Sequence, residues 1–77
     1  MSAPPPMRPV YSSHVDSIGY DEEANELYVR YQTGRLAIYQ AVPPLKAAQV
    51  MGAPSIGGAL HALVRGRHRH RYGDDGE

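Results

Sequence analysis

The side chains best suited to chemistry in this 77-residue chain cluster in the segment 65–72, which reads Arg-Gly-Arg-His-Arg-His-Arg-Tyr. The arginines Arg65, Arg67, Arg69 and Arg71 recur at every second position, so in an extended strand they point the same way. Guanidinium groups make bidentate, charge-assisted hydrogen bonds to phosphates. This spacing predicts contact with a nucleic-acid backbone. The alternative is a solvated basic tail that improves solubility and balances the acidic start of the chain.

Charge is uneven along the chain, although the formal total is +0. Residues 27–72 contain seven Arg or Lys residues and no acid, whereas residues 1–26 carry a formal charge of −4 and the last five residues carry −3. The cations outside the 65–72 segment are Arg30, Arg35 and Lys46. A basic region of this extent favours a polyanionic partner such as a nucleic acid.

The tyrosines supply all six aromatic residues, because Phe and Trp are absent. Nucleic-acid bases stack on exposed aromatic rings at about 1–3 kcal/mol each. Tyr31 shares a strand face with apolar neighbours and is predicted to be in the core, whereas Tyr28 shares a face with Arg30 and is the better candidate for an exposed platform. Tyr39 fits either role. The alternative is that the tyrosines pack the core and its edges.

A weak anion site is predicted where Ser55, Gly57 and Gly58 open a helix, because free N–H groups at a helix start bind phosphates. The alternative is that both glycines serve backbone geometry or close packing.

Several classes of function are disfavoured by what the sequence lacks. It has no cysteine, so disulfides and thiolate metal sites are excluded. Nucleophile motifs, phosphate loops and zinc-binding helices are also absent, so we expect no enzyme activity and no cofactor. His68 and His70 are flanked by arginines, which disfavours a metal site. With no long apolar run, we expect a soluble, cytoplasmic protein without a membrane partner.

The organisation predicted is one small domain over residues 10–72, between a disordered Pro-rich arm (1–9) and a disordered acidic tail (73–77). Alternation predicts strands over 15–20, 27–31 and 36–41, with a bulge near Gly19. Helices follow over 45–51 and from Ser55, its N-cap, to a stop at Gly66. We therefore expect an α+β fold in which a three-stranded antiparallel meander precedes two short helices packed on one face.

These segments form a pattern that resembles the KTSC domain. The resemblance lies in Ser-Ser-His-Val-Asp-Ser-Ile-Gly-Tyr-Asp (12–21), Leu-x-Val-x-Tyr-x-x-Gly (27–34), Val-Pro (42–43), Ala-x-Ser-x-Gly (53–57) and Val-Arg (64–65), and it spans residues 10–65. The family usually has a Tyr-x-Tyr pair in its central strand, where this chain has Ala37 and Tyr39. It also favours aromatic residues where this chain has Ala47 and Leu60.

The resemblance implies a free-standing small bacterial or phage protein, similar to a domain at the C-terminus of certain lysyl-tRNA synthetases. That setting implies a noncatalytic binding module, with RNA as the suggested ligand. The competing expectation is a module for protein interaction or self-association, because the strands at the two edges of an open meander can pair with another chain.

Overall fold

The computed structural model describes residues 5–73. Expectations for residues 1–4 and 74–77 lie outside this range. The elements in chain order are β1 (Arg8–Pro9), β2 (Val15–Asp21), β3 (Glu26–Tyr31), β4 (Leu36–Tyr39), α1 (Pro44–Met51), α2 (Ile56–Leu63) and β5 (His70–Tyr72).

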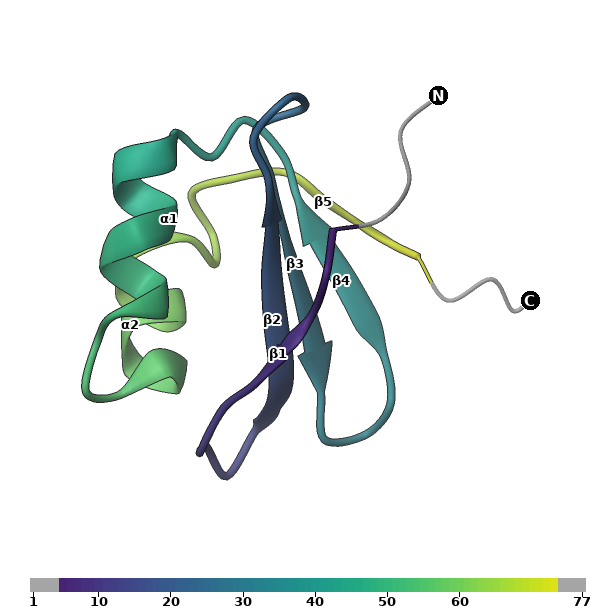
Figure 1. Cartoon of the computed structure of the whole chain (residues 1–77), viewed down its shortest axis with the longest axis vertical. Coiled ribbons are helices and arrows are strands. Elements are labelled where there is room, and N and C mark those ends of the chain that lie inside the picture. Colours follow the sequence, from purple (N-terminus) through teal and green to yellow (C-terminus); the bar gives the residue numbers. More distant parts are fainter. Residues whose placement is uncertain (1–4, 74–77) are drawn as a thin grey trace.

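The strands form one antiparallel sheet in the order β1-β2-β3-β4-β5, and both helices lie on the same side of it (Figure 1). The α+β class and the helix pair are thus confirmed. The predicted three-stranded meander is wrong in strand number, because the sheet has five strands and four of them precede the helices. None of the helices within residues 5–73 is long and apolar enough to span a membrane.

The two strands that were not predicted are short pieces at the edges. In β1, Arg8 and Pro9 pair with Ile18 and Ser17, so the end of the Pro-rich arm is ordered on the sheet. In β5, the second half of the basic segment pairs with β4, and the Gly73 N–H donates to the Leu36 carbonyl at 2.9 Å. Neither piece has apolar alternation long enough to signal a strand, and each forms because a sheet edge stands beside it.

The β2–β3 and β3–β4 connections explain the register of the central strands. The Asp21 carboxylate accepts hydrogen bonds from the Glu23 and Ala24 N–H groups, which starts the turn between β2 and β3. Gly34 has a φ of +94°, a value that favours glycine and closes the β3–β4 hairpin. The register of β2 against β3 shifts between Val15 and Ser17, so the irregularity lies earlier than the bulge predicted near Gly19.

Both helices begin within one residue of their predicted starts, but α2 ends at Leu63, before the stop predicted at Gly66. Pro44 occupies the first turn of α1. Ser55 caps α2, its hydroxyl accepting the Gly58 N–H at 3.2 Å. The apolar stripes face the sheet: Ala47 and Val50 from α1, Ile56 and Leu60 from α2, and Val64 directly after α2 are buried.

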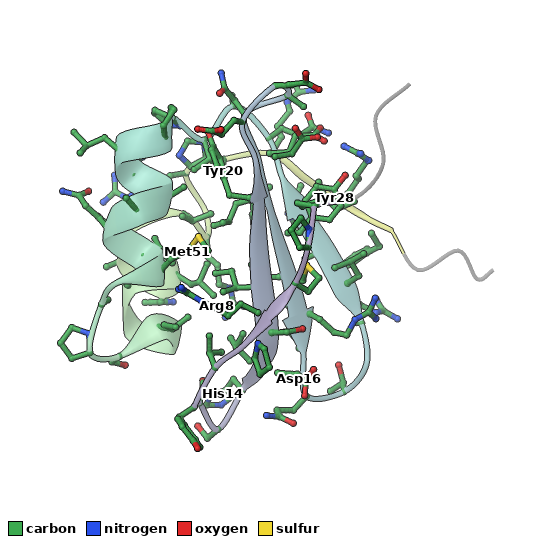
Figure 2. All side chains as sticks on the ribbon, viewed as in Figure 1. Arg8, His14, Asp16, Tyr20, Tyr28 and Met51 are labelled. Carbon is green, nitrogen blue, oxygen red and sulfur yellow. The ribbon has the colours of Figure 1, made fainter. Side chains whose placement is uncertain are left out.

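The sheet buries apolar side chains on both faces. The helix-side core combines the two helices with Val15, Ile18, Leu27, Val29 and other strand residues. A second cluster on the opposite face contains Tyr28, Leu36 and Ile38, with Met7 packed against it. Figure 2 shows Tyr28 on this side, away from the helices. The expectation that Tyr28 is exposed is therefore wrong: its side chain is 8% exposed, because the arm covers this face of the sheet.

Candidate nucleic-acid interface

Three adjoining hollows form a groove beside Arg65, and Tyr31 and Arg65 line all three. Their volumes are about 410, 250 and 300 Å³. We call this feature the Arg65 groove, and its lining residues are Ser12, Ser13, His14, Val15, Tyr31, Gln32, Thr33, Ala37, Tyr39, Ser55, Gly57, Gly58, Leu60, His61, Arg65, Gly66, His70 and Tyr72. Among these described lining residues none is acidic, so the groove suits an anion.

One end of the groove lies where the start of α2 meets the chain before β2. The Ser12 hydroxyl accepts the N–H groups of His14 and Val15, each at 3.2 Å, which shapes the approach to β2. A Cβ placed on Gly57 would lie 3.6 Å from the Ser12 Oγ, so the hydroxyl and the helix start are in close proximity. A hydroxyl that accepts two hydrogen bonds still has its own hydrogen to donate. This end of the groove is therefore rich in donors.

Imidazoles and a guanidinium complete that end. The His14 Nδ1 lies 3.0 Å from the Ser13 Oγ. His61 lies on the exposed side of α2 and Arg65 in the turn that follows it, and both line the hollow. Arginine carries a permanent positive charge, and an imidazole N–H group can donate a hydrogen bond. Together they form a surface that attracts phosphate or carboxylate groups.

The other end of the groove is aromatic and is built by β4 and β5. The ring of His70 lies 5.5 Å from that of Tyr39 and 5.3 Å from that of Tyr72. The Arg35 guanidinium stands over the Tyr72 ring, 4.6 Å from its centre. Tyr72 is 55% exposed, so its ring remains accessible to a ligand.

A pair of phenols lies under the groove between these two ends. The Tyr31 and Tyr39 hydroxyls are 2.7 Å apart, and Tyr39 is only 4% exposed. Burial is the larger cause and the hydrogen bond to Tyr31 the second, and both raise the pKa of Tyr39 above its usual 10.0. The phenol therefore stays neutral and adds no negative charge to the groove.

The structure brings some of the predicted site residues together. Arg65 and the candidate anion-site residues Ser55, Gly57 and Gly58 line the same hollow. Arg35 reaches the groove through its contact with the Tyr72 ring. Tyr39 lines the aromatic end but is buried, so it supports the groove and is not an open platform.

The remaining predicted cations lie outside the lining of the groove. The Arg30 guanidinium donates to the Gly34 carbonyl at 2.7 Å, and Lys46 Nζ lies 2.9 Å from the His68 Nε2. Arg67 Nε donates to the Ala62 carbonyl at 2.9 Å, and Arg69 is exposed.

Arg71 binds Glu26 at 2.7 Å, and this hydrogen bond raises the pKa of the Arg71 guanidinium. The four arginines do not share one face, because residues 64–67 form a turn and the extended strand starts only at His70.

Several groove residues were not predicted as site residues, namely Ser12, Ser13, His14, Tyr31, His61, His70 and Tyr72. Local patterns carry little signal for them, because they come from four separate segments that the fold brings together. The signal in the sequence that pointed to some of them was the family resemblance. Its Ser-Ser-His motif (12–14) and its Ser-x-Gly motif (55–57) lie side by side in the structure.

The described residues offer no cluster of three His, Asp or Glu side chains that could hold a metal ion. His68 is engaged between Lys46 and the Gln40 carbonyl, at 2.9 and 3.1 Å.

Comparison with known proteins agrees with the fold and with the motifs around the groove. The family model for the KTSC domain matches residues 11–68. A protein of Stutzerimonas stutzeri is 36% identical over 61 residues, which cover 79% of this chain and 84% of that protein. A protein of Tsukamurella paurometabola is 33% identical over 63 residues, covering 82% and 94% of the two chains.

A solved structure gives the same result. The crystal structure of a KTSC domain protein from Yersinia pestis superposes with a TM-score of 0.82 at 29% sequence identity, covering 86% of this chain and 93% of that one. The family match covers the residues before β2 and the turn after α2, which form the donor-rich end of the groove, whereas His70 and Tyr72 of the aromatic end lie beyond it. This chain belongs to the KTSC domain family.

Proposed function

We propose that this protein is a noncatalytic binding module that holds single-stranded RNA in the Arg65 groove. The observation that carries the proposal is the lining of the groove, which joins cations and hydrogen-bond donors at one end to accessible aromatic rings at the other without a described acid between them. Proteins that bind single strands combine these two features: a positive path for the phosphates and rings for unstacked bases.

The roles of the groove residues follow from their chemistry. Arg65 lies at the centre and suits a phosphate, and the donors at the start of α2 suit the neighbouring phosphate. Tyr72, held by the Arg35 guanidinium, offers a face for one base. Arg30, Lys46 and Arg71 keep their structural contacts, and their charges contribute only to the long-range attraction of the polyanion.

Fluorescence anisotropy with a labelled single-stranded RNA, titrated with salt, tests this proposal. We expect Arg65→Ser to weaken binding and to reduce the slope of log affinity against log salt by about 0.7, the value for one phosphate on a single strand. Arg67→Ser is the matched control, since it removes the same charge two positions away and outside the groove. Tyr72→Leu is expected to lower the affinity by about 1–3 kcal/mol without changing the salt slope.

Two results would count against the proposal. One is the absence of binding even at low ionic strength. The other is an equal effect of Arg65→Ser and Arg67→Ser, which would mean that total charge and not the groove attracts RNA. The noncatalytic part is checked by gel electrophoresis of the RNA after prolonged incubation, where we expect it to remain intact.

A further inference from the structure

The outer edge of β5 is an open side of the sheet in the described part of the chain. The strand order ends at β5, and His70, Arg71 and Tyr72 are all exposed. In an antiparallel pair, successive residues of a strand direct their N–H and C=O groups alternately toward and away from the partner. The direction at each position of β5 can therefore be worked out from its bonds to β4.

The bonds to β4 place His70 and Tyr72 on the outward side. The Arg69 carbonyl accepts the Gln40 N–H at 2.8 Å, and the Gly73 N–H donates to the Leu36 carbonyl at 2.9 Å. Residues 69 and 73 thus face β4, and so does Arg71, which is opposite Ile38. The N–H and C=O groups of His70 and Tyr72 point away from the sheet, which gives β5 two donors and two acceptors for another strand.

The opposite edge of the sheet lacks this capacity. The Val10 N–H donates inward to the Asp16 carbonyl at 3.1 Å, so by the same alternation Arg8 faces β2 and Pro9 faces outward. Proline has no N–H, and proline at an edge strand is a common device against pairing. Of the two edges in residues 5–73, β5 is the one equipped to accept a partner.

We propose that a second copy of this chain occupies this edge, through antiparallel pairing of β5 with β5 about a two-fold axis at Arg71. This register makes a hydrogen-bonded pair of His70 with Tyr72 of the second copy, and the same pair again on the other side of the axis. All the outward groups of the strand are then used. The pairing is isologous and closes after two copies, so it makes a dimer and not a fibre.

Charge supports a second copy as the occupant. The two Arg71 side chains face each other at the axis, a placement that is costly for unpaired like charges. Here each is held by Glu26 of its own chain at 2.7 Å, which lowers that cost. The sequence carries Arg65, Arg67 and Arg69 before β5 and three acids after it, so two chains paired in opposite directions are complementary in charge.

The dimer also has a consequence for the groove. Paired residues share a face of the sheet, so His70 stands beside Tyr72 of the second copy on the face that carries the ring contacts of Tyr39 and His70. The aromatic ends of the two grooves would then meet at the axis. This consequence concerns the proposed function, whereas the dimer itself rests on backbone geometry and charge and is tested without RNA.

Sedimentation equilibrium of the full chain from about 10 µM to about 1 mM tests the dimer, over the affinity range of a small interface. We expect reversible association that weakens as salt increases. His70→Pro removes one outward N–H and leaves the bonds to β4 in place, so it is expected to be monomeric. His70→Ala keeps that N–H and is the matched control that still associates.

Amide hydrogen exchange separates loss of pairing from loss of β5. The Arg71 and Gly73 amides face β4 and should be protected at every concentration, in His70→Pro as well, whereas the His70 and Tyr72 amides should be protected only at high concentration. A chain that stays monomeric throughout would overturn the proposal. So would association that survives in His70→Pro while the Arg71 and Gly73 amides stay protected, because another surface would then be responsible.

Discussion

Gly19→Ala tests whether the N-terminal arm can pack on the sheet only because Gly19, which lies beneath it, has no side chain. Gly19 lies in the middle of β2, opposite Tyr28, and faces away from the helices. A Cβ at this position would lie 2.6 Å from the Pro6 carbonyl oxygen and 2.9 Å from the Met7 Sδ. The Met7 side chain can rotate away, but the Pro6 carbonyl is backbone, so the arm itself must move.

The size of the effect follows from what the arm contributes. Its contacts include the pairing of Arg8 and Pro9 with β2, the packing of Met7 on the Tyr28 cluster and the hydrogen bond from the Arg8 guanidinium to the Met51 carbonyl at 3.3 Å. Overpacking of a close contact costs about 1–3 kcal/mol. For a domain of this size each kcal/mol corresponds to about 4–8 °C in the melting temperature. Urea unfolding followed by circular dichroism measures the loss, and we expect about 1–3 kcal/mol in the full chain.

A deletion of residues 1–9 provides the control. None of the fully buried residues of the helix-side core belongs to the arm, so the shortened chain keeps that core. In that background Gly19→Ala meets no carbonyl, and alanine is favoured over glycine in a strand by about 0.5–1 kcal/mol. The substitution should therefore change from destabilising to neutral or stabilising. An equal loss in both backgrounds would show that the clash with the arm is not the cause.

Two further predictions concern stability. The raised pKa of Tyr39 means that the folded chain holds the phenol proton more tightly than the unfolded chain, so the stability linked to it is complete below pH 10 and is lost as the pH rises above 10. Tyr39→Phe should therefore reduce the fall in urea midpoint between about pH 9 and pH 11, and an unchanged fall would contradict the assignment. Leu60→Ala, at a side chain 1% exposed, should cost about 2–5 kcal/mol in the same assay, whereas Leu45→Ala, at a side chain 74% exposed, should stay within about 0.5 kcal/mol; similar losses would contradict the described core.

The elements that could be predicted from the sequence are those whose signal is local. Ser55 caps α2 because its hydroxyl suits that position, and Ile56, Leu60 and Val64 are buried along the predicted stripe. The stripe and the strand β3 could be predicted because each pattern spans more than one repeat of its period. The β3–β4 turn also has a local cause, because glycine tolerates the positive φ that Gly34 adopts. The edge strands carry no such pattern: β1 contains a proline, and every residue of β5 is exposed.

The candidate site was harder to predict, because its residues are joined by tertiary structure. Ser12 and Gly57 lie far apart in the sequence, and no spacing rule connects them. The tyrosine assignment failed for a related reason. Alternation correctly placed Tyr28 and Arg30 on one face of β3, but that face is covered by Met7 from an arm that composition alone suggested would be disordered. Face and exposure are separate questions, and only the first can be answered from alternation.

The basic segment shows how position in the sheet decides which residues of an alternating run meet a ligand. The run of arginines at every second position suggested a phosphate-binding face, but the chain joins the sheet only at His70. From there, alternation directs His70 and Tyr72 toward the face where Tyr39 offers a ring to pack on, and it directs Arg71 toward the face where Glu26 offers a carboxylate. Each side chain gains a partner that complements it, a ring for His70 and a carboxylate for Arg71. This orientation of β5 is therefore favoured over the one in which the two faces are exchanged. His70 and Tyr72 therefore reach the groove, and Arg71 anchors the strand that carries them.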